Sequence, residues 1–290
     1  MTDFSRRRID YKIPAEYDEK KVMAYLRGEA KLSSRLIRTL KHYEDGILLN
    51  DKHIRTVDLL KEGDILSVIL PDSKNEIEPL DYELDVIFED DDLLVINKPA
   101  LLPMHPTHNH QGDTLANAVI HRLIKEGKQP SFKAVGRLDK GTSGLVVCAL
   151  NSHSAARLQA KIKKTYYAVV DGVYEGKGTI DLPIYRPDPL KTLRAVGEGG
   201  DRAVTHWKAL KNDSRRTLLE INLETGRTHQ IRVHFASLGT PLTGDRMYGH
   251  ECEEISHQAL HCGKIEFIHP VTGTLLNLEC PMPDEMNNLL

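Results

Sequence analysis

A short polar stretch at residues 136–144 separates apolar segments and contains Arg137 and Asp139. A carboxylate held in such a turn can act as a nucleophile or a general base. Aspartates in turns also commonly cap the backbone, and an Arg-Leu-Asp sequence is frequent in proteins. Residue type and position therefore leave both a catalytic role and a turn-capping role open for Asp139.

A second polar stretch, residues 223–234, begins as a strand end and turns into a predicted helix. His229 and His234 could ligate a metal, but helical zinc pairs are four residues apart and no third ligand is evident. We favour hydrogen-bonded packing for both histidines. His105, His108 and His110 lie in a Pro-containing loop without evident carboxylate or thiol partners. We predict no metal site.

The elements that position these stretches indicate a mixed fold. Apolar runs at 84–88 and 93–97, separated by four acids, predict a hairpin. Thr114 could cap a helix over 115–125 that Gly127 ends. The remaining expected elements are a buried strand at 144–150, a basic helix at 155–164, strands at 166–170, 204–210 and 217–223, and a mobile loop at 190–202. The sum is an α+β fold with a mainly antiparallel sheet and flanking helices.

A smaller α/β unit precedes this fold. Residues 33–41 predict a helix with Ser33 as its N-cap, followed by a short strand at 46–50. Three basic residues recur on one helix face at a spacing that could follow a phosphate backbone or simply form a solvated surface. They are Arg35, Arg38 and Lys41. The acidic segment 72–92 predicts a linker, which divides the chain into domains 1–75 and 76–290.

Charge is segregated along the 290 residues, although the net charge is only −3. Residues 121–165 hold ten Lys or Arg against two acids, and residues 251–290 hold one Lys against seven acids. A basic segment of this kind favours a nucleic-acid partner, although solvated helix faces give similar runs. We predict RNA contacts for three lysines in it. They are Lys161, Lys163 and Lys164.

The remaining composition predicts an intracellular protein. The four cysteines form no C-x-x-C pair, which indicates reduced thiols. The apolar runs are far shorter than the roughly 20 residues of a bilayer crossing. Residues 1–13 lack the apolar core of an export signal. We therefore predict a cytoplasmic location without membrane association.

Four separated blocks resemble the RluA family of pseudouridine synthases from about residue 84 onward. They lie at 94–106, 137–145, 164–172 and 225–249, and include the sequences Asn-Lys-Pro, Arg-Leu-Asp, Lys-Thr-Tyr-Tyr and Gly-Arg-Thr-His-Gln-Ile-Arg. The N-terminal region resembles the alpha-L module of S-four-type ribosomal proteins across about fifty residues. The resemblance implies an RNA-modifying isomerase with an added RNA-binding domain.

The resemblance also implies roles for individual residues. Asp139 is the essential carboxylate, which either attacks the sugar C1′ or removes a proton from C2′ through a glycal. Arg232 pairs with it, and Tyr166 stacks on the target base and assists proton removal from C5. Arg137 fills the gap left by the flipped nucleotide. Arg227 and His229 are further expected RNA contacts, and no cofactor is expected because bonds break and form within one nucleotide.

One position departs from the family pattern, because Gly136 stands where most members have histidine. Glycine is typical there of the related RsuA-type enzymes, so substrate choice and base flipping stay open. The alpha-L module favours large-subunit ribosomal RNA over transfer RNA as substrate. We expect a monomer. The alternative from another class is a non-catalytic RNA-binding assembly factor, which would tolerate loss of Asp139.

Overall fold

The computed structural model describes residues 4–71, 76–159 and 161–290. Its N-terminal part is a four-stranded sheet in the order β1-β4-β2-β3, with every pairing antiparallel. The elements of this part are β1 (Arg8–Lys12), η1 (Ala15–Tyr17), α1 (Val22–Gly28), α2 (Ser34–Leu40), β2 (Ile47–Leu49), β3 (Lys52–His53) and β4 (Ile65–Ile69). They enclose a hydrophobic cluster of their own.

Helix α2 forms as its sequence predicts. The Ser33 side chain accepts a hydrogen bond from the backbone N–H of Leu36 at 3.1 Å, which caps the helix. The apolar face of α2 is buried, while Arg35, Arg38 and Lys41 are all exposed. The prediction that α2 has a buried apolar face and an exposed basic face is therefore confirmed.

The larger part is built on a ten-stranded sheet in the order β10-β13-β14-β9-β15-β8-β6-β5, with β16 beside β15 and β7 beside β8. The pair β8–β15 is parallel and the other pairs are antiparallel, which confirms the predicted mainly antiparallel α+β fold. Its strands are β5 (Val86–Glu89), β6 (Leu93–Lys98), β7 (Lys133–Val135), β8 (Ser143–Ala149), β9 (Lys163–Val170), β10 (Lys177–Asp181), β13 (Val204–Asn212), β14 (Thr217–Leu223), β15 (Leu260–Ile268) and β16 (Leu275–Glu279).

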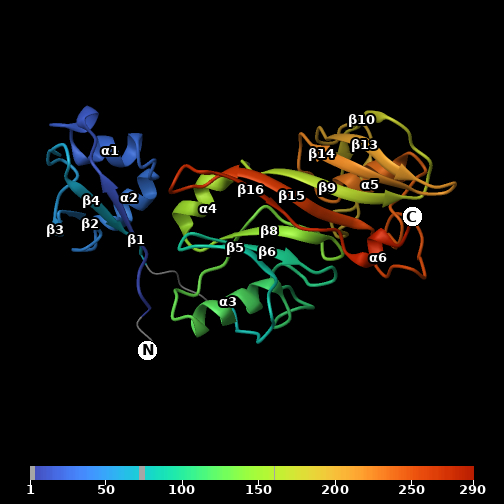
Figure 1. Cartoon of the computed structure of the whole chain (residues 1–290), viewed down its shortest axis with the longest axis horizontal. Helices are drawn as coiled ribbons and strands as arrows, with labels where there is room; N and C mark the ends of the chain where they lie inside the picture. The colour runs from blue at the N-terminus through green and yellow to red at the C-terminus, as the bar shows by residue number, and fades with distance from the viewer. Residues whose placement is uncertain (1–3, 72–75, 160) are drawn as a thin grey trace.

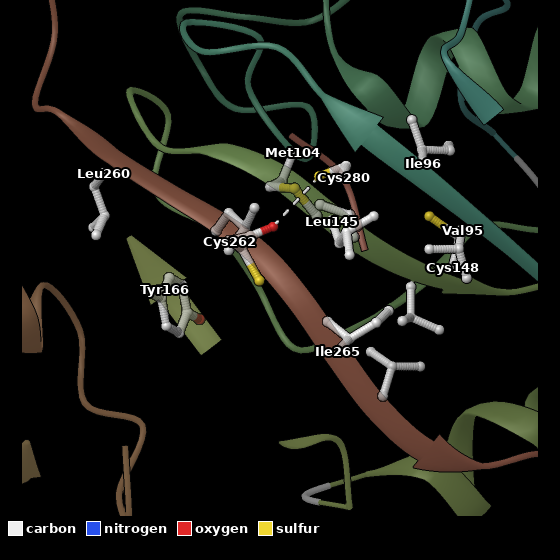
Figure 2. Packing of buried hydrophobic residues seen from close by; sticks show 14 of the residues in the cluster. Val95, Ile96, Met104, Leu145, Cys148, Tyr166, Leu260, Cys262, Ile265 and Cys280 are labelled. Atoms are coloured by element: carbon white, nitrogen blue, oxygen red, sulfur yellow. Dashed lines mark hydrogen bonds between the residues drawn. The ribbon is translucent and has the colours of Figure 1, made fainter. Parts of the chain in front are cut away.

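Figure 1 shows α3, α4, α5 and α6 around this sheet, and a short two-stranded ladder accompanies them. They are α3 (Leu115–Lys125), α4 (Ser152–Leu158), α5 (Gln230–Ser237), α6 (Asp284–Asn287) and the pair β11 (Ile184–Tyr185) with β12 (Ala195–Val196). Apolar residues of β6, β8, β9, β15 and α3 form the main core. Figure 2 shows Tyr166 next to β15 at one side of this packed cluster.

Most elements expected from the sequence are present. The hairpin β5–β6, the strands β8, β9, β13 and β14, and the helix α3 match their predicted positions. Thr114 caps α3, and Gly127 follows its end with a φ of 70°. The segment predicted as a loop at 190–202 contains β12, so it is partly ordered by pairing with β11.

The basic helix predicted at 155–164 is wrong in its bounds. Asn151 caps the helix by accepting from the N–H of Ser154, so α4 starts earlier, at Ser152. Its C-cap Gln159 is extended, with φ −53° and ψ 127°. Lys163 then pairs with Glu266 in the β9–β15 ladder. Pairing with β15 thus overrides the helical propensity of Lys163 and Lys164.

The predicted boundary between residues 75 and 76 adjoins residues 72–75, which lie outside the described residues, so that boundary stays a prediction. The two sheets meet at an ion pair. Arg7, just before β1, donates to Asp92 from Nε at 3.1 Å and from Nη2 at 2.7 Å. Arg157 of α4 also donates to the backbone oxygen of Ala30 at 3.5 Å.

Candidate active site

Strand register brings the Asp139 turn beside Tyr166. Cys262 of β15 pairs with Gly144 of β8 on one side and with Tyr166 of β9 on the other, so the three residues form one row. Gly144 has a φ of 106°, and a Cβ there would lie 2.3 Å from the oxygen of Cys262. Only glycine permits this close parallel approach. The turn that carries Asp139 therefore ends at the level of Tyr166.

A buried lysine hydrogen-bonds to the turn that carries Asp139. Lys98, at the end of β6, is fully buried and donates from Nζ to the oxygens of Pro99 at 2.8 Å, Leu102 at 3.1 Å and Lys140 at 3.4 Å. Burial lowers the pKa of Lys98 to about 7, although the charge of Asp139 acts to raise it. Lys98 thus fixes the residue that follows Asp139 and adds a titratable charge beside it.

Arg232 of α5 pairs with two carboxylates. Its Nε and Nη2 each donate to Asp245 at 2.7 Å, and its Nη1 lies 3.5 Å from Oδ2 of Asp139. Burial acts to lower the pKa of Arg232, but the hydrogen bonds and charge of Asp245, together with Asp139, raise it above its ordinary value. The expected pairing of Arg232 with Asp139 is present, and the bidentate partner is Asp245.

His229 and Tyr248 complete the cluster. Nδ1 of His229 lies 2.8 Å from the Tyr248 hydroxyl, and Nε2 lies 3.9 Å from Oδ2 of Asp139. The guanidinium of Arg232 lies over the Tyr248 ring, 5.0 Å from its centre. His234 instead is fully buried and contacts Thr205 Oγ1 at 2.9 Å, so the packing role predicted for His234 fits its contacts.

Tyr166 presents a largely buried phenol to this cluster, with 8% of its surface exposed. Burial raises its pKa well above the ordinary value, and the charges of Cys262 and Asp139 act in the same direction. The phenol is therefore neutral at pH 7. A neutral aromatic plane beside a carboxylate can stack on a base and exchange a proton with it.

Several predicted RNA contacts border this cluster. Gly136 has a φ of 74°, and a Cβ there would lie 3.2 Å from Nζ of Lys164, so the ammonium of Lys164 adjoins the place of the usual histidine. Arg137 is exposed, and its charge acts on His105. Arg227 is exposed and lies 3.3 Å from Asp201.

Other predicted contacts lie elsewhere. Lys161 is exposed, and Lys163 forms an ion pair with Glu266 at 2.6 Å. The basic face of α2 is at the opposite end of the molecule from α5, which carries Arg232 (Figure 1). Its three basic residues therefore lie far from the Asp139 cluster.

The described residues contain one close group of metal-type ligands, formed by Asp90, Asp92 and His269 within 4.8 Å of one another. Nδ1 of His269 accepts the backbone N–H of Val271 and Thr272, so its proton is on Nε2, which lies 2.8 Å from Asp90. An Nε2–H cannot ligate a metal. The group therefore fits a close polar contact between His269 and Asp90, in which Nε2 offers no lone pair to a metal.

Contacts of the loop histidines differ partly from expectation. His110 does have a carboxylate partner, because its Nδ1 lies 2.6 Å from Asp113, and its Nε2 lies 3.1 Å from Nζ of Lys140. His105 packs edge-to-face on Phe132. All four cysteines are free thiols, as predicted. In the described part of the chain, each helix is too short or too polar to cross a bilayer.

Three residues of the cluster were not identified as functional from sequence. They are Lys98, Asp245 and Tyr248. Each lies inside one of the four blocks that resemble the RluA family, in the sequences Asn-Lys-Pro and Gly-Asp-Arg-Met-Tyr-Gly. A lysine at the end of an apolar strand is a usable sequence signal, because a lysine is rarely fully buried unless it is paired.

Comparisons with known proteins agree with this geometry. The sequence model described as RNA pseudouridylate synthase matches residues 92–237. The chain is 37% identical to the uncharacterized RNA pseudouridine synthase YhcT of Bacillus subtilis, over 98% of this chain and 96% of that protein. It is 40% identical to the ribosomal large subunit pseudouridine synthase D of Pseudomonas aeruginosa, over 72% of each. The structure of human RNA pseudouridylate synthase domain containing 1 superposes with a TM-score of 0.57 at 25% identity, covering 71% of this chain and 86% of that one.

Proposed function

The chain belongs to the RNA pseudouridylate synthase family and is a pseudouridine synthase, and from this premise we propose that Asp139 is its catalytic carboxylate. The observation that carries the proposal is the cluster in which Oδ2 of Asp139 lies 3.5 Å from Nη1 of Arg232 and 3.9 Å from Nε2 of His229. An arginine beside a carboxylate favours its ionised form. The ionised oxygen can then attack C1′ or remove the C2′ proton of a flipped uridine.

Tyr166 and Arg232 have distinct supporting roles in this proposal. The phenol of Tyr166 stacks on the uracil after the glycosidic bond breaks and assists removal of the C5 proton once C5 has bonded to C1′. Arg232 orients Asp139 and stabilises the negative charge that develops on the detached uracil. Arg137, which is exposed next to the turn, occupies the space that the flipped nucleotide leaves.

Large-subunit ribosomal RNA is the proposed substrate. Support comes from the names of relatives in Pseudomonas aeruginosa and Xanthomonas campestris, which are 40% and 37% identical to this chain. We further propose that residues 1–75 form an RNA-binding domain of the alpha-L type whose α2 contacts ribosomal RNA. Lys161, Lys163, Lys164, Arg227 and His229 would contact RNA near the reacting uridine. A cytoplasmic monomer suits this substrate.

Asp139→Asn tests the catalytic proposal. Because asparagine keeps the shape but cannot be a nucleophile or base, turnover should fall more than about a thousand-fold while RNA affinity stays within about twofold. Pseudouridine formation and RNA binding are measured on the same transcript. Lys140→Gln, which changes the adjacent exposed side chain, is the matched control and should retain activity. Turnover near wild type in Asp139→Asn refutes the assignment.

Pseudouridine mapping identifies the RNA. Total RNA from cells with and without the protein is compared at single-nucleotide resolution, and a site lost only in large-subunit ribosomal RNA supports the proposed substrate. A site lost only in transfer RNA overturns it while leaving the enzyme assignment intact.

A further inference from the structure

Tyr248 connects the segment between β11 and β12 to the catalytic cluster. Its phenol oxygen accepts the backbone N–H of Arg194 at 2.9 Å and lies 2.8 Å from Nδ1 of His229. A phenol has one proton to donate, and this oxygen already accepts an N–H. Nδ1 of His229 is the partner positioned to take that proton in a hydrogen bond. Neutral His229 then carries its own proton on Nε2.

The tautomer matters because His229 is neutral at pH 7. Burial lowers the pKa of His229, and the charges of Arg232 and Arg194 act in the same direction. The charges of Asp139 and Asp245 act to raise this pKa but do not restore its ordinary value. Nε2 lies 3.9 Å from Oδ2 of Asp139. A neutral imidazole has one N–H and one lone pair, so the tautomer decides which of them faces the carboxylate.

The backbone of His229 is also unusual. It has a φ of 59° and a ψ of 18°, in the left-handed region, directly before α5. Its side chain makes no capping hydrogen bond to that helix. A non-glycine residue keeps this conformation only where its surroundings hold it there, as is common at functional sites. In this conformation the imidazole lies 2.8 Å from the Tyr248 hydroxyl and 3.9 Å from Asp139.

We propose that Tyr248 is a positioning residue that holds His229 as the Nε2–H tautomer, so that an N–H and not a lone pair faces Asp139. The proposal rests on the catalytic role proposed for Asp139. An N–H directed at a carboxylate favours its ionised form, whereas a lone pair repels it. The same hydroxyl accepts the N–H of Arg194, so one hydrogen-bond chain joins the β11–β12 segment to His229.

Nitrogen-15 NMR of ring-labelled histidines tests the tautomer directly. The His229 resonances are assigned by their absence from the His229→Gln spectrum. At pH 7.5 the wild-type protein should show a protonated Nε2 and an unprotonated Nδ1, and Tyr248→Phe should show a mixture of tautomers. A wild-type spectrum with the proton on Nδ1 overturns the proposal whatever the activities are.

Kinetics tests the consequence. Tyr248→Phe keeps the ring beneath Arg232 and removes only the hydroxyl, so kcat should fall roughly 3- to 10-fold with an unchanged KM for RNA. In His229→Gln the side-chain amide can place an N–H near the former Nε2 without any tautomer. Adding Tyr248→Phe to His229→Gln should therefore cost nothing further. Losses that multiply in the double variant contradict the proposal.

The control is Tyr174→Phe, which removes a hydroxyl bonded to Thr240 at 2.6 Å outside the cluster and should leave kcat unchanged. Asp139→Asn separates the two levels of the argument. If Asp139→Asn is active, the proposed function fails. If Asp139→Asn is inactive and Tyr248→Phe matches wild type in both kcat and NMR pattern, only the positioning role of Tyr248 fails.

Discussion

The carboxylates of Asp92 and Asp139 each face an arginine, and they differ in how closely their oxygens are held. Asp92, 3% exposed, accepts from Arg7 at 2.7 and 3.1 Å and from Asn151 at 2.9 Å. Asp139, 17% exposed, has Arg232 at 3.5 Å and no nearer cationic group among the described ion pairs. Short bonds use the lone pairs of Asp92, whereas Asp139 has a compensating charge and oxygens that substrate can still reach.

The difference originates in the arginines. Arg7 gives its Nε and Nη2 edge to Asp92, but Arg232 gives the same edge to Asp245 and only Nη1 to Asp139. Backbone N–H groups of Met247 and Tyr248 also donate to Asp245 at 3.0 and 3.2 Å. Asp245 therefore fixes Arg232 so that its charge reaches Asp139 without a tight bidentate bond.

Asp245→Asn should make the contact of Arg232 with Asp139 more like the tight contact of Arg7 with Asp92. Without the competing carboxylate, Arg232 can turn its bidentate edge to Asp139 and occupy the reactive oxygens. We expect kcat to fall about 100-fold, as for a displacement near 1 Å in a catalytic group. Single-turnover assays on saturating RNA measure this loss.

The matched control is Asp201→Asn, which removes an exposed carboxylate that pairs with Arg227 and should leave kcat nearly unchanged. A wild-type kcat in Asp245→Asn would show that Asp245 serves stability alone. The proposal that Asp245 keeps Arg232 from binding Asp139 tightly would then be wrong.

The sequence indicated the residues that we propose to react but not the residues that hold them in place. Asp139, Tyr166 and Arg232 stand in recognisable blocks, and local patterns predicted α2, α3 and the central strands. Asp245 could not be assigned because its role depends on where a turn thirteen residues beyond Arg232 folds back. The left-handed backbone of His229 likewise has no sequence signal, since histidine usually adopts negative φ.

Arg7→Met tests the other side of the comparison. It leaves Asp92 buried without its cationic partner, and breaking a buried pair by removing one member typically costs about 3 to 5 kcal/mol. Since Arg7 is 27% exposed, we expect the lower end, about 3 kcal/mol, in the free energy of unfolding from urea titration. The kcat at 25 °C should stay within about twofold, because the pair lies outside the Asp139 cluster.

Arg8→Met is the control for Arg7→Met, because the ion pairs of Arg8 with Asp10 and Asp51 are exposed and should contribute little. Equal destabilisation by both substitutions would mean that the junction at Asp92 is not a specific tie. A large drop in kcat for Arg7→Met would couple the two regions that the comparison treats as separate.

Lys98 is a buried lysine whose partners are carbonyl oxygens instead of a carboxylate. Its folded-state pKa of about 7 lies below the ordinary 10.5, so between these values the unfolded chain binds more protons and stability from this group rises with pH. The difference in unfolding free energy between wild type and Lys98→Met should thus shift in favour of wild type by about 1 to 3 kcal/mol from pH 7 to pH 9.5. Groups that titrate in both proteins cancel in this difference.

Because the charge of Asp139 raises the pKa of Lys98, the rise in stability with pH should begin at a lower pH in an Asp139→Asn background. A flat difference in both backgrounds would mean that the three carbonyls keep Lys98 charged without help from Asp139.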